Sequence, residues 1–202
     1  TQVPTDPAAR ERSAGKLRTV LPSRRDVACC HCGEETFILG QAHFSMCPKC
    51  HKRFDVVDYT LGTTCAPVIR TGGAVRISPE GTLIGGDIQA AFIILDGAFS
   101  GGRMEAFRSM EFRPGARVND FSKLFFRDLI IAEGTDLSFQ SPLVCRTLDV
   151  GGRLQADVTA TGRVSVRSGA MLQGRVKTPS LRVEDGGGLI GSMVIGSMEN
   201  AS

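Results

Sequence analysis

Two neighbouring stretches decide the fold: VSVRSGAMLQGRV at residues 164–176 and LRVEDGGGLIGSM at residues 181–193. Each begins with two apolar residues separated by one position, and each continues with a glycine that has a leucine three places after it. Side chains alternate between the two faces of a strand, so this apolar pair places one face of a short strand inward. Glycine suits the corner that follows, because it adopts positive φ without a steric penalty. We therefore expect the two stretches to be equivalent coils of one repeating structure.

The same apolar pair recurs from residue 75 onwards, at intervals of 16 to 19 residues. A repeat this short and regular is typical of a solenoid, in which each coil packs only on its neighbours. The seven pairs are Val75/Ile77, Ile93/Leu95, Met110/Phe112, Leu129/Ile131, Leu148/Val150, Val164/Val166 and Leu181/Val183. Six units also carry a glycine with an apolar residue three places on, and the unit around Gly97 does not: Gly81/Ile84, Gly115/Val118, Gly134/Leu137, Gly151/Leu154, Gly169/Leu172 and Gly186/Leu189.

These patterns predict an all-β protein in which residues 75–196 form a parallel β-helix of about seven coils. The alternative is an antiparallel β-sandwich, which would show turn signals every 8–12 residues or so and hairpin dipeptides. Asp96-Gly97 and Asp185-Gly186 are such dipeptides, but both fit corners of the longer repeat. Residues 197–202 are expected to be a short tail.

Composition agrees with an ordinary globular protein. Of the 202 residues, 42% are hydrophobic and 22% are charged, and the net charge of +3 is too small to indicate a nucleic-acid-binding protein. No run approaches the roughly 18 apolar residues of a membrane span. The chain begins at Thr1, so any native start or targeting segment before it is not visible. The odd number of cysteines, seven, favours a reducing compartment, and we expect a cytoplasmic protein.

Cysteine spacing gives the sharpest local signal. Cys29, Cys32, Cys47 and Cys50 form the pattern C-x2-C-x14-C-x2-C, which predicts a zinc ribbon over residues 27–58 with a structural Zn²⁺. Each C-x-x-C makes a tight knuckle, and His51 stands where the second knuckle would usually have glycine. An iron site or a redox pair is the alternative.

The segments that flank this ribbon lack a strong pattern. Residues 1–26 are expected to be a disordered basic tail, in which Lys16, Arg18, Arg24 and Arg25 could contact an anionic surface such as the inner membrane. Residues 59–74 are expected to link the ribbon to the β-helix, placing the ribbon where it could shield the first coil. Five arginines of the third and fourth coils are expected on a solvated outer face: Arg103, Arg108, Arg113, Arg117 and Arg127.

The carboxyl-terminal coil is almost uncharged. A monomeric solenoid normally covers its last coil with polar residues or a helix, because the open end exposes unpaired strand edges and apolar side chains. We expect self-association here, and the residues predicted to carry it are Leu189, Ile190, Met193, Val194 and Ile195.

Residues 75–196 resemble the bactofilins, a bacterial family of polymer-forming cytoskeletal proteins. The resemblance rests on the period, the glycine corners and two similar runs, GTLIGGDI at residues 81–88 and GGGLIGSMV at residues 186–194. It implies a right-handed β-helix that polymerises end to end without nucleotide and localises partner proteins as a cytoplasmic scaffold. The chain departs from the family in its ribbon, which could limit assembly to dimers, and in having no phenylalanine at the carboxyl-terminal contact.

Two other functions are considered as alternatives, catalysis and an adaptor role. Catalysis is not expected, because all three histidines lie in the ribbon, and the acidic residues Asp120, Asp128, Glu133 and Asp136 fit turns and corners. The ribbon could instead be an adaptor that binds a protein or nucleic acid, with the β-helix as a dimerising spacer. Nucleic acid is the weaker partner, because acidic residues in the ribbon offset its basic ones.

Overall fold

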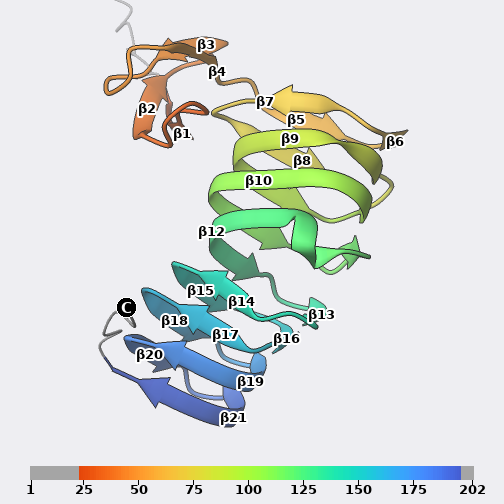
Figure 1. Ribbon diagram of the computed structural model, residues 1–202, viewed down its shortest axis with the longest axis vertical. Coiled ribbons are helices and arrows are strands. Elements are labelled where there is room, and N and C mark those ends of the chain that lie inside the picture. Colours follow the sequence, from red (N-terminus) through yellow and green to blue (C-terminus); the bar gives the residue numbers. More distant parts are fainter. Residues whose placement is uncertain (1–22, 197–202) are drawn as a thin grey trace, which may run out of the picture.

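The computed structural model describes residues 23–196, which contain strands and one short 3₁₀ turn (Figure 1). Residues 24–58, called the cysteine module below, form two antiparallel hairpins: β1 (Arg24–Ala28) with β2 (Glu35–Leu39), and β3 (Phe44–Met46) with β4 (Arg53–Asp55). The module therefore begins inside the expected tail. Arg24–Ala28 is a paired strand, which corrects the expectation of disorder up to residue 26.

The rest of the described chain is a parallel β-helix, as the sequence predicted. Its elements are β5 (Tyr59–Leu61), β6 (Thr64–Cys65), β7 (Val68–Arg70), β8 (Ala74–Ile77), β9 (Thr82–Leu95), β10 (Ala98–Phe112), β11 (Arg117–Val118), the 3₁₀ turn η2 (Phe121–Lys123), β12 (Leu124–Ile131), β13 (Asp136–Ser138), β14 (Leu143–Cys145), β15 (Thr147–Val150), β16 (Arg153–Gln155), β17 (Val158–Ala160), β18 (Arg163–Val166), β19 (Met171–Thr178), β20 (Ser180–Val183) and β21 (Gly188–Ile195).

Each coil has three faces, named here in chain order. Face A carries the predicted apolar pairs, face B follows the first corner, and face C follows the second. Face A is a continuous ladder of eight strands, in the order β20-β18-β15-β12-β10-β9-β8-β5. The long strands β9 and β10 bend through all three faces, so they pair along several coils at once.

The seven predicted pairs stack in register on face A. Val75 lies opposite Ile93, Ile93 opposite Met110, and the ladder continues in this way to Leu181. Their side chains form one buried column with the inward residues of the other faces, except at the last coil. The predicted repeat and the parallel pairing of its strands are thus confirmed.

The solenoid has one coil more than expected. Residues 59–70 form β5, β6 and β7, which pair in parallel with β8 and β9, so the expected linker over 59–74 is wrong. Tyr59 and Leu61 occupy the inward positions of face A opposite Val75 and Ile77. The first residue of every later pair is Val, Ile, Met or Leu, whereas here it is Tyr59, which is why the sequence did not reveal this coil.

The corner glycines differ in their physical role. Gly134, Gly169 and Gly186 adopt positive φ, as expected. At Gly97 and Gly115, by contrast, the neighbouring coil leaves no space for a Cβ atom. A Cβ on Gly97 would lie 2.3 Å from the Gly81 carbonyl oxygen, and one on Gly115 would lie 2.2 Å from the Asp96 carbonyl oxygen. These two corners therefore need glycine because backbones of adjacent coils approach each other closely.

The expected three-residue spacing between glycine and buried apolar residue is wrong at Gly81. Ile84, three places after Gly81, is 59% exposed, and Leu83 is the buried residue of that unit. Leu83 pairs with Phe99, which holds the same position in the irregular Gly97 unit. Face B starts one residue earlier in these two coils, so the apolar residue comes two places after the glycine.

The solenoid is interrupted between its fourth and fifth coils. Face A continues from β10 to β12, but the ladders of faces B and C stop at β11 and at the start of β12 and restart at β13 and β14. At this level the chain makes two longer excursions, and Phe121 and Phe139 from them stack with ring centroids 4.0 Å apart. Both rings lie near Phe112, so aromatic packing connects the fourth and fifth coils at this level.

Candidate functional site

The four predicted ligand cysteines lie together in the cysteine module. The Sγ atoms of Cys29, Cys32, Cys47 and Cys50 are all within 4.8 Å of one another. The Cys29–Cys50 and Cys32–Cys47 Sγ distances are 3.7 and 3.5 Å. Four sulfurs bound tetrahedrally to an ion at about 2.3 Å would be separated by about 3.8 Å. The cluster thus has the size and ligand set that a tetrahedral metal ion requires, and these residues could hold one.

The two knuckles have matching backbone geometry. The Gly33 N–H donates to the Cys29 carbonyl at 2.8 Å, and the His51 N–H donates to the Cys47 carbonyl at 3.0 Å. Gly33 has φ of 71° and His51 has φ of 57°, so histidine takes the left-handed position that glycine takes in the first knuckle. Backbone N–H groups of His31 and Lys49 point at the sulfurs of Cys29 and Cys47, each at 3.4 Å. Such donors stabilise thiolates.

The thiols differ in acidity. Burial opposes ionisation of Cys47, but hydrogen bonds from the backbone of Cys50 and Lys49 outweigh it and lower the pKa of Cys47 to about 6. A backbone hydrogen bond from Glu34 favours ionisation of Cys32, but burial and the adjacent thiols raise the pKa of Cys32 to about 12. Thiolates this close repel each other, so ionisation of the whole cluster requires a cation at its centre.

The remaining cysteines lie apart from this cluster. Cys30 is buried in the small apolar core of the module, and Cys145 is buried in the solenoid core. Cys65 lies in β6 and packs partly buried against the solenoid core. None of the three is part of a group of potential metal ligands within residues 23–196.

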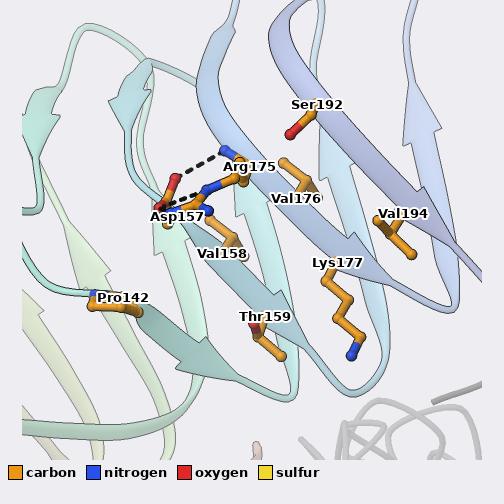
Figure 2. A pocket seen from close by; sticks show the side chains of 9 residues that line it. All are labelled: Pro142, Asp157, Val158, Thr159, Arg175, Val176, Lys177, Ser192 and Val194. Atoms are coloured by element: carbon orange, nitrogen blue, oxygen red, sulfur yellow. Dashed lines mark hydrogen bonds and ion pairs between the residues drawn. The ribbon is translucent and has the colours of Figure 1, made fainter. Parts of the chain in front are cut away.

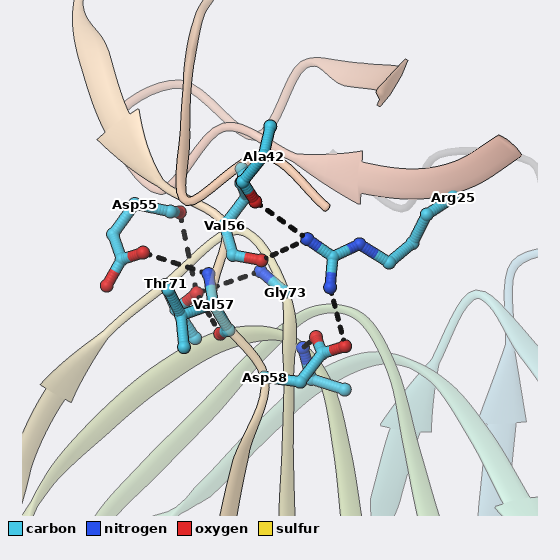
Figure 3. A network of polar contacts seen from close by, with 9 residues as sticks. Arg25, Ala42, Asp55, Val56, Val57, Asp58, Thr71 and Gly73 are labelled. Atoms are coloured by element: carbon cyan, nitrogen blue, oxygen red, sulfur yellow. Dashed lines mark hydrogen bonds and ion pairs between the residues drawn. The ribbon is translucent and has the colours of Figure 1, made fainter. Parts of the chain in front are cut away.

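The predicted surface-binding residues differ in their environments. Lys16 and Arg18 lie outside the described residues. Arg24 is exposed, pairs with Asp26 and stacks over the Phe37 ring. Arg25 is engaged inside the module: its guanidinium donates to the carbonyls of Ala42 and Val56 and to Asp58 (Figure 3). This use of Arg25 corrects the expectation of a free basic side chain.

The module docks against the corners between face C and face A. Its closest contact is at Gly72, which accepts a hydrogen bond from the Ala28 N–H at 3.1 Å and donates one to the Asp55 carbonyl at 2.7 Å. Next to it, the buried Thr71 hydroxyl donates to the Val57 carbonyl at 2.8 Å (Figure 3). The first coil is thereby joined to the module by backbone and side-chain hydrogen bonds.

Two arginines of later coils also hold the module. Arg108 and Arg127 both pair with Glu35, at 3.2 and 3.0 Å, and Phe107 packs against the module's apolar core. The expected solvated position is wrong for Arg108, which is half-buried, whereas Arg127 is exposed although it pairs with Glu35. Only the fold brings Glu35 next to corners more than seventy residues away, and nothing in the local sequence around Glu35 indicated this contact.

The predicted assembly residues divide between two surfaces. Leu189, Met193 and Ile195 continue the inward columns, in register with Leu172, Val176 and Thr178. Those three partners are buried, whereas Met193 and Ile195 are at least half exposed because no further described coil covers them. Ile190 and Val194 alternate with them and face outward. Leu181 and Val183 complete the same open end on face A, which the prediction omitted.

The first coil is the other end of the solenoid. Its inward side chains are only partly buried: Tyr59, Leu61, Cys65 and Ile69. The cysteine module lies beside one corner of this coil and does not extend across it (Figure 1). Within the described part of the chain, both ends of the apolar column are therefore open.

A groove runs along face C of the last four coils (Figure 2). It has a volume of about 310 Å³. The Asp157–Arg175 ion pair lies at one side of it, and Lys177 and Val194 lie toward the last coil. The charged groups of this pair neutralise each other, and the lining of the groove extends to Ser192 and Val194 in the last coil.

No helix within residues 23–196 is long and apolar enough to cross a membrane.

Comparison with known proteins finds a similarity in the second half of the solenoid. The sequence model of a family described as "Bactofilin: Polymer-forming cytoskeletal" matches residues 127–194, about a third of the chain. This stretch runs from the corner that ends the fourth coil to the last strand, so it coincides with the regular coils after the interruption. No curated protein and no solved structure matches the chain. Residues 127–194 are therefore similar to a family described as polymer-forming and cytoskeletal, and they lie in coils of the parallel β-helix.

Proposed function

We propose that the protein is a cytoskeletal scaffold whose solenoids polymerise end to end without nucleotide and localise partner proteins. The observation that carries this proposal is the open carboxyl-terminal coil. Met193 and Ile195 lie in columns whose other members are buried, so a second copy placed there would cover them as another coil does. The uncovered strand edges of β20 and β21 would gain hydrogen-bond partners in the same contact.

The openness of both ends favours extension beyond a dimer. A module lying across the first coil would stop assembly at one contact, but the module lies beside that coil. Subunits of eight coils, with strands spaced by about 4.8 Å, would then add about 40 Å each to a filament. The family match is consistent with this mode of assembly. We place such filaments in the cytoplasm, with Lys16, Arg18 and Arg24 as residues for peripheral contact with the inner membrane.

Negative-stain electron microscopy of the purified full chain tests the assembly. We expect filaments without added nucleotide, and we expect their loss in Ile195→Arg, which places a charge on the open column. Val144→Arg is the matched control, because Val144 is 65% exposed on the outer side of the fifth coil. Monomers of the parent protein at high concentration would overturn the proposal, as would equal loss of filaments in both variants.

We also propose that the cysteine cluster binds a structural Zn²⁺. Four thiolates give no open coordination position, which is typical of structural rather than catalytic zinc. Metal analysis should give about one zinc per chain, and Cys47→Ser should release it while Cys65→Ser should not. Recovery of iron, with its visible absorption, would contradict the choice of metal but not the site.

The exposed side chains of the module favour a second candidate function as an adaptor. Four large apolar residues on β2 and β3 are about half exposed or more: Phe37, Leu39, Phe44 and Met46. Arg24 lies over the Phe37 ring and Arg53 over the Phe44 ring. Protein partners and single-stranded nucleic acids can both use this arrangement. Retention on a nucleic-acid column that falls with salt would favour nucleic acid, and its absence would leave the protein-binding version.

A further inference from the structure

We infer that metal binding by the cysteine module holds the first four coils of the solenoid together, and that this effect ends at the interruption before the fifth coil. The inference rests on the metal site proposed above and extends it from a local fold to the stability of half the solenoid. It follows from where the metal ligands lie relative to the docking contacts.

The first contact is continuous with a metal ligand. Ala28, whose N–H donates to the Gly72 carbonyl, directly precedes Cys29, and the Cys29 N–H donates to Glu34 on the other side of the first knuckle. Movement of Cys29 away from the cluster would therefore move the donor that anchors the first coil. A change in metal occupancy would therefore directly affect the hydrogen bond at that corner.

The fit at Gly72 leaves no room for a looser arrangement. A Cβ on this residue would lie 2.4 Å from Cε2 of Phe54 and 2.5 Å from the Ala28 carbonyl oxygen. Phe54 belongs to the apolar core of the module, and it follows the second knuckle closely in sequence. Both knuckles thus contribute to the surface on which the corner rests.

The contacts continue along the solenoid from this corner. Glu35, three residues after Cys32, reaches Arg108 and Arg127, which lie at the corners that end the third and fourth coils. Phe107 adds an apolar contact beside Arg108. The module therefore adds direct contacts between corners that the strand ladders and the shared apolar core also connect.

The module is too small to maintain this surface without help. Its buried apolar core consists of Val27, Cys29, Cys30, Ile38, Cys47, Phe54 and Val56. Domains below about 40 residues usually need a metal, disulfides or oligomerisation, and the free energy of binding a structural metal is then folding free energy. The free cysteines show no disulfide in the described chain, so metal binding is the available source.

The interruption after the fourth coil sets the limit of the effect. Two of the three strand ladders stop there, so loosening of faces B and C in the first four coils is not transmitted by hydrogen bonds to the next. The later coils have their own inter-coil ion pairs, Arg146–Asp128, Arg167–Asp149 and Arg175–Asp157. They are also the part that the family model matches by itself.

Hydrogen–deuterium exchange of the full chain, with zinc and after chelation, tests the inference. We expect chelation to speed exchange of buried amides in β5, β7, β8 and β9 by about tenfold or more, and to leave β15, β18 and β20 unchanged. Gly72→Ala should reproduce this pattern while still binding zinc, because the substitution breaks the docking contact and not the cluster. Gly62→Ala is its control, since the nearest atom to its Cβ is 4.0 Å away.

A second matched pair probes the ionic contact. Glu35→Gln removes the partner of Arg108 and Arg127, whereas Glu34→Gln removes a pair with Lys49 inside the module. Faster exchange near residues 107–112 in the first variant alone supports the inference. Bound zinc with equal protection before and after chelation would overturn this inference and leave the metal site intact. Failure to bind any metal would overturn both, and equal loss of protection in all eight coils would overturn the boundary.

Discussion

Met193 lies in register with Val176 in the same inward column of face C, yet Val176 is 1% exposed and Met193 is 50% exposed. The two positions have the same environment except for the coil that follows. Covering the last coil would therefore remove from water the apolar surface that now distinguishes them. At roughly 25 cal/mol per Å² of apolar area, such burial is the main driving force available to assembly.

Substitution of two inward-facing methionines, Met110 on face A and Met193 on face C, should separate folding from assembly. Met110→Ala removes a side chain that is 0% exposed and should lower the free energy of unfolding by about 2–5 kcal/mol. Met193→Ala should cost less than half of that, because its side chain is half exposed, but it should weaken assembly. Urea denaturation below the assembly concentration measures the first effect and light scattering the second. Equal destabilisation by both would show that the last coil is covered within one chain.

The corner glycines should respond to alanine according to the space around them. Gly174 has φ of 134°, and a Cβ there would lie 2.1 Å from the Ala156 carbonyl oxygen. Gly169 has φ of 74° and no atom within 4 Å of its Cβ position. Gly169→Ala should therefore cost about 1 kcal/mol from the backbone conformation alone. Gly174→Ala should cost clearly more, because two coils must separate. Thermal unfolding of both variants tests this order, and a reversed order would contradict it.

Stability should fall in acid through Asp128. Burial raises the pKa of this carboxyl, but hydrogen bonds from Arg146 and Thr147 outweigh burial and hold the pKa below its ordinary value. A lowered folded-state pKa contributes stability above the unfolded value of about 3.9, and that contribution is lost as pH falls from there toward the folded value. Asp128→Asn should cost about 1–2 kcal/mol at pH 7 and much less below pH 4 or so.

The control for this pH dependence is Asp136→Asn, because Asp136 is exposed on β13. It should change the unfolding free energy little at either pH. If the cost of Asp128→Asn were the same at pH 7 and in acid, the ionised form of Asp128 would not be the source of its contribution.

The aromatic pair at the interruption should act as a unit. Phe121 and Phe139 come from the two excursions and stack at 4.0 Å. In a double-mutant cycle of the two alanine variants we expect a coupling energy of about 0.5–1.5 kcal/mol. Independent effects of the two substitutions would mean that the interruption is stabilised elsewhere. The cycle with Phe121 and the exposed Phe37 is the control, and no coupling is expected there.

Local patterns in the sequence predicted most of the fold because a solenoid is built from local repeats. The pair Val164/Val166 and its equivalents specified inward strand positions, and parallel stacking follows when every unit has the same period. The cysteine spacing likewise predicted the four residues whose sulfurs converge, since each knuckle is a local turn. The signals failed where the chain departed from the repeat, at Tyr59 in the first coil and at Leu83 in the second.

What only the tertiary structure decided is how separate segments meet. The sequence by itself determined the β-helix, its period and the grouping of the four cysteines, because these depend on spacing along one strand or one turn. The docking of Glu35 on Arg108 and Arg127 depends on the stacking of coils, which places distant corners in one line. The same stacking buried Val166 and left Val183 43% exposed, although both belong to apolar pairs that the sequence describes in the same way.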